Sequence, residues 1–213
     1  MPTEQNAPDK VSRDAILEAA ADAIARTSHN VTSIEAVIAA MRFSYEDVVD
    51  AFGSSSGLLT ALVERLALSL LEPLVHRTPG HGIHERLNAF GQRVIEAHRS
   101  SQLQCLYRIA LNNDVRKNGV AQDFYRQGPG LVTAGLTSFF DAAHAAGAVT
   151  PQASHALASH FMALMRSTLD MVDTTAFGGP SILRTLAAGK VSSVVERFCA
   201  GIQKKVDHAY VVR

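Results

Sequence analysis

The stretch from Thr32 to Leu59 constrains the fold of this chain most, because it holds two short helical patterns separated by a turn of only a few residues. A hydroxyl residue precedes each pattern. Thr32 or Ser33 stands before the first and Ser44 before the second, and such side chains accept hydrogen bonds from the free N–H groups at the start of a helix. A turn this short makes the two helices cross instead of packing antiparallel. The sequence therefore predicts a helix-turn-helix, the arrangement of many DNA-binding domains.

Ten residues of this stretch fit one family pattern or its common variants. They are Thr32, Ser33, Ala39, Ser44, Phe52, Gly53, Ser54, Gly57, Leu58 and Leu59. The stretch therefore resembles the N-terminal domain of TetR-type transcriptional repressors. Residues upstream look like that family's first helix, namely Arg13, Ile16, Leu17, Ala19 and Ala20. The resemblance implies contacts with double-stranded DNA from residues at the helix starts and in the turn. We assign these contacts to Thr32, Ser33, Arg42, Ser44, Tyr45, Ser54 and Ser55.

Three departures from the family pattern affect these expected contacts. Arg42 stands in the turn where the family has glycine, and a left-handed conformation costs a residue with a Cβ about 1 kcal/mol. The turn is therefore expected to be either strained or differently shaped. Residues 46–49 read Glu-Asp-Val-Val in place of Gly-Thr-Leu-Tyr, so the tyrosine hydroxyl that would contact a phosphate is missing. Ser55 and Ser56 replace a Lys-Glu pair, which removes a second phosphate contact.

The charge of the N-terminal part is unusual for a DNA-binding domain. Up to Thr60 the chain has four basic and nine acidic residues, whereas the whole chain has 20 of each. Glu46, Asp47 and Asp50 lie in the predicted second helix, where they repel the phosphates that provide most nonspecific affinity. A carboxylate can still accept a hydrogen bond from cytosine N4, so base recognition remains open.

The composition predicts an all-α protein. Hydrophobic residues make up 47% of the chain, aromatic residues only 6%, and there is no tryptophan, which favours close-packed helices over sheets. We divide the chain into a disordered arm over 1–11, a helix-turn-helix domain of three helices over 12–55, and a larger helical ligand-binding and dimerisation domain over 56–213.

Apolar periodicity predicts six further helical segments. They run over 57–76, 84–100, 101–116, 120–147, 151–173 and 181–205. Pro73 should kink or end the first, and Gly128-Pro129-Gly130 must bend the fourth. The piece Asp123–Pro129, which reads DFYRQGP, resembles the C-terminal domain of AefR-like members of the TetR family. The family resemblance implies that the last two helices form a homodimer interface.

Family resemblance also implies a small-molecule effector held among the helices of the larger domain. Aromatic, methionine and polar side chains at helical spacing are candidates to line its site. They are Phe90, Tyr107, Arg108, Phe124, Phe140, His144, Phe161 and Met165. Such residues are more often plain core. If they form a site, its ligand should be mainly apolar and oriented by Tyr107, His144 or Arg108.

No catalytic, metal or cofactor motif stands out, so we predict no enzyme activity and no cofactor. His76, His81 and His84 lie close together but lack the cysteine or carboxylate partners of zinc sites. Cys105 and Cys199 have apolar neighbours and are interpreted as buried thiols. No run is long and apolar enough to span a bilayer, and the start lacks a secretion signal, so a cytoplasmic protein without membrane contact is expected.

The sequence supports two functional hypotheses. The first is a dimeric TetR-like transcriptional regulator, a repressor, whose DNA binding is modulated by a small apolar effector. The alternative is a TetR-fold module that binds a ligand or a protein partner and has lost operator-specific DNA binding, because its recognition helix is acidic. The sequence identifies neither the operator, the regulated genes nor the effector, and it does not separate repression from activation.

Overall fold

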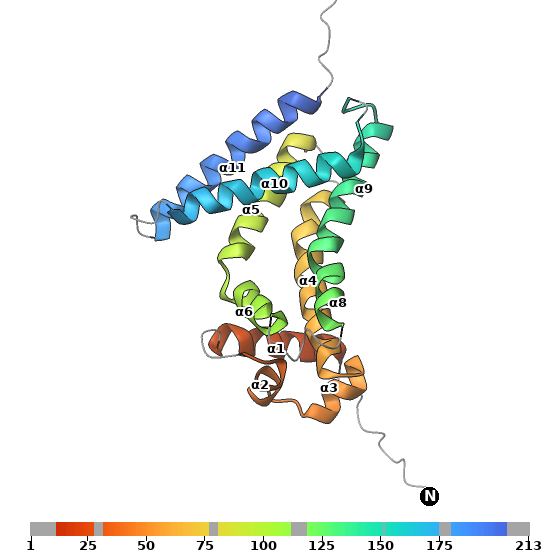
Figure 1. The fold of residues 1–213 in the computed structure, drawn as a ribbon, viewed down its shortest axis with the longest axis vertical. Helices are drawn as coiled ribbons and strands as arrows, with labels where there is room; N and C mark the ends of the chain where they lie inside the picture. Colours follow the sequence, from red (N-terminus) through yellow and green to blue (C-terminus); the bar gives the residue numbers. More distant parts are fainter. Residues whose placement is uncertain are drawn as a thin grey trace, which may run out of the picture. The chain divides into compact units, whose positions relative to one another are not determined.

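The computed structural model describes residues 12–27, 32–76, 81–111, 119–150, 152–174 and 180–203. Over 170–174 and 180–187 it describes the backbone alone. Over these residues the regular elements are helices, and a single isolated bridge pairs Val149 with Gln203 (Figure 1). The predicted all-α class is confirmed. The predicted arm over 1–11 lies outside the described residues.

The helices follow the apolar periodicity of the sequence, with ends that differ by a few residues from those predicted. Their bounds are α1 Arg13–Thr27, α2 Ile34–Ala39, α3 Tyr45–Phe52, α4 Ser55–Val75, α5 Ile83–Arg99, α6 Ser101–Ala110, α8 Val120–Tyr125, the π-helical turn η1 Arg126–Gly130, α9 Leu131–Ala145, α10 Ser154–Thr174 and α11 Pro180–Ile202. The prediction of one helix over 101–116 was wrong in its end, because α6 stops at Ala110 and Leu111 caps it.

The chain divides into two compact units. Unit 1 comprises Met1–Ala67 and Ala97–Gly128, and unit 2 comprises Leu68–Glu96 and Pro129–Arg213. Helices α4 and α5 therefore contribute residues to both units. The functional domains expected from the sequence, 12–55 and 56–213, stay a prediction.

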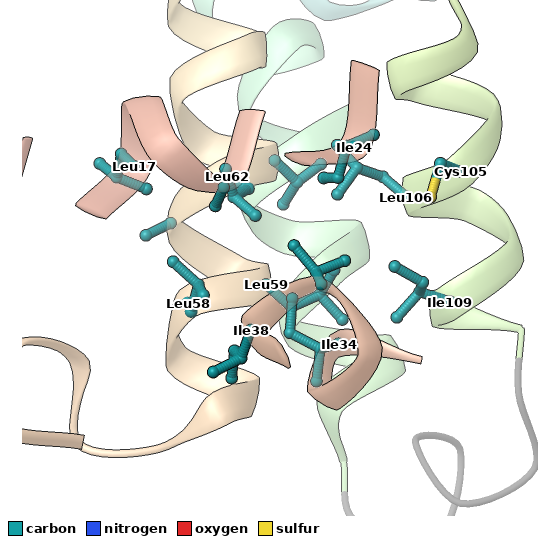
Figure 2. Packing of buried hydrophobic residues seen from close by; sticks show 14 of the residues in the cluster. Leu17, Ile24, Ile34, Ile38, Leu58, Leu59, Leu62, Cys105, Leu106 and Ile109 are labelled. Atoms are coloured by element: carbon teal, nitrogen blue, oxygen red, sulfur yellow. The ribbon is translucent and has the colours of Figure 1, made fainter. Parts of the chain in front are cut away.

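The core of unit 1 is an apolar cluster to which α1, α2, α3, α4, α6 and α8 all contribute. Figure 2 shows side chains of α1, α2, α4 and α6 converging on one another. The labelled members are Leu17, Ile24, Ile34, Ile38, Leu58, Leu59, Leu62, Cys105, Leu106 and Ile109. Each fully buried Leu or Ile side chain contributes about 1.5–3 kcal/mol relative to its exposure. This cluster fixes α2 against α1 and the first half of α4, which is the framework that the helix-turn-helix needs.

The turn between α2 and α3 differs in shape from the glycine turn of the family pattern. α2 ends at Ala39, and Ala40 caps it in a right-handed conformation with φ −89° and ψ −4°. The Ala40 N–H donates to the Val37 carbonyl at 3.1 Å, and the Met41 N–H donates to the Ile38 carbonyl at 3.0 Å. Among the described residues only glycines have positive φ, so Arg42 is not strained. Of the two alternatives, the differently shaped turn is correct.

The core of unit 2 is aromatic. Phe90 of α5, Phe140 of α9 and Phe161 of α10 are all fully buried. Phe198 of α11 packs against the last two, with ring centroids 5.8 Å from Phe140 and 5.1 Å from Phe161. Aromatic pairs at such distances and tilts contribute more than their buried area alone.

Where the sequence predicts a bend at Gly128-Pro129-Gly130, the helix changes to the π-helical turn η1. Pro129 lies inside this turn, and because proline has no N–H it leaves one carbonyl of the preceding turn without its helical donor. Gly128 lies against Val63 of α4 so closely that an added Cβ would come within 2.8 Å of its Cγ2 atom. The glycine therefore permits the approach of η1 to α4.

Helix α4 continues past Pro73 for two residues before it ends at Val75. The missing N–H of Pro73 leaves the carbonyl of Ser69 without its helical donor. Arg93 of α5 supplies that donor, since its Nη1 atom lies 2.6 Å from the Ser69 carbonyl oxygen, and it also forms an ion pair with Glu72. Arg86 donates to the carbonyls of Pro73, at 3.2 Å, and of Leu74. Two arginines of α5 thus complete the end of α4.

We expect Arg93→Ala to lower the free energy of unfolding by about 1 kcal/mol, as the loss of a bond between a cation and a carbonyl predicts. In a Pro73→Ala background the new N–H bonds the Ser69 carbonyl itself, so the same substitution should cost less. Urea unfolding of the two single variants and the double variant measures the difference.

Glu72→Gln is the matched control for that cycle, because it removes only the ion pair. Its cost should be the same with and without the Pro73→Ala substitution. Equal costs of Arg93→Ala in both backgrounds would show that Arg93 does not replace the missing donor.

Candidate nucleic-acid interface and ligand-binding residues

Serine side chains begin both helices of the helix-turn-helix, as the sequence predicts. Ser33 caps α2, its hydroxyl oxygen accepting from the Ala36 N–H at 3.2 Å. Ser44 caps α3 through a reciprocal capping box with Asp47. The Ser44 hydroxyl accepts from the Asp47 N–H at 3.1 Å, and the Asp47 carboxylate accepts both the N–H and the hydroxyl of Ser44 at 2.8 Å. The bonds with the Ser44 hydroxyl and N–H lower the pKa of Asp47.

The start of α4 carries two further predicted DNA contacts, and their hydroxyls are used differently. The Ser54 oxygen accepts from the Gly57 N–H at 3.0 Å, which leaves its own proton for donation. The Ser55 hydroxyl donates to Glu35 of α2 at 3.0 Å. A carboxylate therefore holds the hydroxyl that was expected to contact a phosphate. Sequence reasoning missed this role of Glu35, which lies 20 residues away along the chain.

The outward face of α3 is polar and acidic. Tyr45 is 52% exposed, and Glu46 and Asp50 are exposed, whereas Val48 is fully buried. The side chain of Asp47, in contrast, is bound to Ser44. The recognition helix thus presents one aromatic ring and two available carboxylates.

Basic side chains near α3 are few. Arg42 is exposed, with its guanidinium 5.0 Å from the centroid of the Phe43 ring. Arg13 of α1 donates to the Ala51 carbonyl at 3.2 Å and lies over the Phe52 ring at 4.5 Å. It therefore interacts with the C-terminal end of α3, where a cation is favourable to the helix dipole. Thr32, the remaining predicted contact, is exposed just before α2.

All seven predicted DNA-contacting residues lie in unit 1, at the starts of α2, α3 and α4 or in the turn. In contrast, the predicted ligand-binding residues are divided between the units. Phe90, Phe140, Phe161 and Met165 are fully buried in the core of unit 2. Tyr107, Arg108 and Phe124 belong to unit 1. The Tyr107 and Phe124 rings are arranged edge to face, with their centroids 5.5 Å apart. Arg108, on the same helix as Tyr107, is half-buried.

His144, the polar candidate of unit 2, already uses both ring nitrogens. Nε2 lies 2.7 Å from the Thr150 carbonyl oxygen, and Nδ1 lies 3.1 Å from the Ser154 hydroxyl. The Gln152 N–H also donates to Nε2, at 3.2 Å. The Thr150 carbonyl requires a proton on Nε2 and the Gln152 N–H requires a lone pair there, so these neighbours do not define one tautomer. His144 thereby joins the end of α9 to the start of α10.

The remaining candidates give no sign of redox or metal chemistry. Cys105 and Cys199 are buried free thiols, and burial raises the pKa of Cys199 to about 11. Over the described part of the chain, no group of three or more His, Cys, Asp or Glu side chains is placed to hold a metal ion. Within those same ranges, none of the helices has the length and apolar character needed to cross a bilayer.

The fold and the helix-turn-helix together define a class: an all-α protein with a helix-turn-helix near its N-terminus and a larger helical body. The family model of the AefR-like transcriptional repressor C-terminal domain matches residues 85–201, which is more than half of the chain. The chain belongs to the TetR family of transcriptional regulators. No curated protein matches it in sequence.

Solved structures of TetR-family regulators share its fold. One from Mesorhizobium loti MAFF303099 has a TM-score of 0.68 at 19% identity and covers 93% of this chain and 100% of that one. The flavonoid-responsive regulator FrrA has a TM-score of 0.63 at 21% identity, covering 91% and 98%. SmeT, the repressor of the Stenotrophomonas maltophilia multidrug efflux pump SmeDEF, has a TM-score of 0.54 at 20% identity, covering 94% of each chain.

Ser44→Ala should lower the free energy of unfolding by about 1 kcal/mol at neutral pH, the usual effect of a lost N-cap. Part of this stabilisation depends on the ionised Asp47. Because the pKa of Asp47 is lowered by folding, that part is fully present above the unfolded value of 3.8 and is lost as the pH falls through the folded pKa. Urea unfolding across this pH range should show that the difference in the free energy of unfolding between wild type and variant becomes smaller as the pH falls.

Ser33→Ala is the control, since Ser33 caps α2 without a carboxylate partner. Its cost should not change over the same acidic range. A constant cost for Ser44→Ala would mean that the bond from the Ser44 hydroxyl to the Asp47 carboxylate does not contribute to stability.

Proposed function

We propose that this TetR-family regulator is a homodimeric repressor whose affinity for its operator is changed by a small, mainly apolar effector. The observation that supports DNA recognition most is the start of α3, where the Ser44 cap fixes the helix so that Tyr45, Glu46 and Asp50 face outward. The hydroxyls of Ser33 and Ser54 retain protons with which to contact phosphates. For these residues, DNA contact is our proposal.

An apolar effector fits the aromatic character of the candidate residues. We propose that Phe90, Phe140, Phe161 and Met165 in unit 2, or Tyr107, Arg108 and Phe124 in unit 1, contribute to its site, and His144 remains a candidate for orienting it. FrrA is described as flavonoid-responsive, and SmeT as the repressor of a multidrug efflux pump. An effector changes DNA affinity only if it binds one conformation of the regulator more tightly than another.

Association through α10 and α11 is the arrangement that we propose for the dimer. The exposed face of α10 carries small residues at helical spacing, namely Ala156, Ser159 and Ala163, with His160 between them. Small side chains allow two helices to approach closely, and two copies of α10 and α11 would form a four-helix interface. A two-fold dimer would set the spacing of two operator half-sites.

A second candidate is a ligand-binding or protein-partner module that has lost operator recognition. Two observations favour it specifically. α3 presents Glu46 and Asp50 outward without a basic residue in the helix, and Glu35 holds the Ser55 hydroxyl. Both features weaken attraction to phosphates.

Titration of the protein with DNA from upstream of its own gene and with random DNA, over a salt series, separates the two candidates. A repressor should bind the first more tightly than the second and lose affinity as salt rises. The slope should be shallow, because each neutralised phosphate contributes about −0.9 to it and few basic residues lie near α3. Flat curves for both DNAs would leave only the second candidate.

Glu35→Ala should raise affinity for the bound DNA roughly tenfold, because it frees the Ser55 hydroxyl for a bond to a charged phosphate. Asp22→Ala, which removes an exposed acidic residue from α1, is the control for charge alone. The gain should disappear in Glu35→Ala/Ser55→Ala, as measured by fluorescence anisotropy. An equal gain in that double variant would show that repulsion, and not the occupied hydroxyl, is the obstacle.

A further inference from the structure

The acceptor groups on α3 restrict which bases this recognition helix can contact. Glu46 and Asp50 are four residues apart, so they lie on the same side of the helix one turn apart, and both are exposed. Asp47 is turned toward the cap, because its Oδ2 atom accepts both the N–H and the hydroxyl of Ser44. The buried Val48 fixes the rotation of the helix about its axis. The outward surface is therefore set by packing and by the cap.

An ionised carboxylate can only accept hydrogen bonds. In the major groove, guanine presents two acceptors, thymine presents an acceptor beside its methyl group, and adenine presents an acceptor beside its amino donor. Cytosine alone presents a donor, its N4 amino group, without an acceptor of its own. A recognition helix with two free carboxylates therefore matches cytosine best, opposes guanine and thymine, and meets in adenine a donor with an acceptor beside it.

The spacing of the two carboxylates limits where these cytosines can lie. Four residues span about 6 Å along a helix axis, and successive bases of a strand are about 3.4 Å apart along B-DNA. Glu46 and Asp50 thus match two bases that are one or two steps apart.

The scarcity of basic side chains near α3 makes this base contact more decisive. A carboxylate that faces guanine or thymine loses its hydration without gaining a hydrogen-bond donor. The unpaired charge that results lowers the affinity for that DNA sequence. With Arg13 directed to the end of α3, nonspecific phosphate attraction does little to compensate for such a mismatch. Specificity here comes as much from rejection of wrong bases as from attraction to the right ones.

We propose that each operator half-site presents two cytosines, one or two steps apart on one strand, whose N4 amino groups donate to Glu46 and Asp50. This inference rests on the DNA-binding function proposed above. It assigns the specificity of the helix-turn-helix to two acidic residues of α3.

Selection from a pool of random DNA duplexes, followed by sequencing, tests the proposal with the wild-type protein, Glu46→Gln and Asp50→Asn. The wild type should enrich sites with a cytosine pair at this spacing, and changing either cytosine to guanine should weaken binding by about 10- to 100-fold. Glu46→Gln and Asp50→Asn should each shift the preference at one of the two positions toward adenine, because an amide both donates and accepts. Asp22→Asn on α1 should leave the selected motif unchanged.

The outcomes distinguish this inference from the function on which it rests. A wild-type motif without the cytosine pair, or a motif that Glu46→Gln and Asp50→Asn both leave unaltered, would overturn the inference while DNA binding stands. Failure of the wild type to enrich any sequence would overturn the proposed repressor function and the inference with it.

Discussion

The reciprocal hydrogen bonds between Ser44 and Asp47 are the interaction on which the outward face of α3 depends. They satisfy the N–H groups of Ser44 and Asp47 and fix the residue at which the helix begins. Once that residue is fixed, the positions of Tyr45, Glu46 and Asp50 follow from helical geometry. The same bonds hold one oxygen of one of three carboxylates at the cap, so part of the acidic character of the helix is structural.

The cap is effective only because the helices behind it are held by apolar packing. Side chains of α1, α2, α4 and α6 share one buried cluster, and Val48 anchors α3 beneath its polar face. The turn after α2 is compatible with this packing without a glycine, because its backbone stays right-handed through Ala40. An altered turn and an acidic helix thus coexist with an intact helix-turn-helix framework.

Features that depend on neighbouring residues could be predicted from the sequence, and features that depend on distant ones could not. The caps at Ser33 and Ser44 and the interrupted helix at Pro129 follow from local backbone chemistry. The bond between Ser55 and Glu35 joins residues of different helices, and no spacing indicates it. The division of the candidate ligand residues between two units likewise depends on how the chain folds back, since Tyr107 and Phe140 look alike in an apolar pattern.

The end of α4 belongs to a helix that lacks its own stop signal. No capping glycine comes directly after Val75, and Pro73 removes one donor from the last turns. Arg86 and Arg93, from the next helix, provide the missing donors. The last turns of α4 therefore acquire these hydrogen bonds only after α5 has docked, which makes the completion of one helix and the arrival of another a single cooperative event.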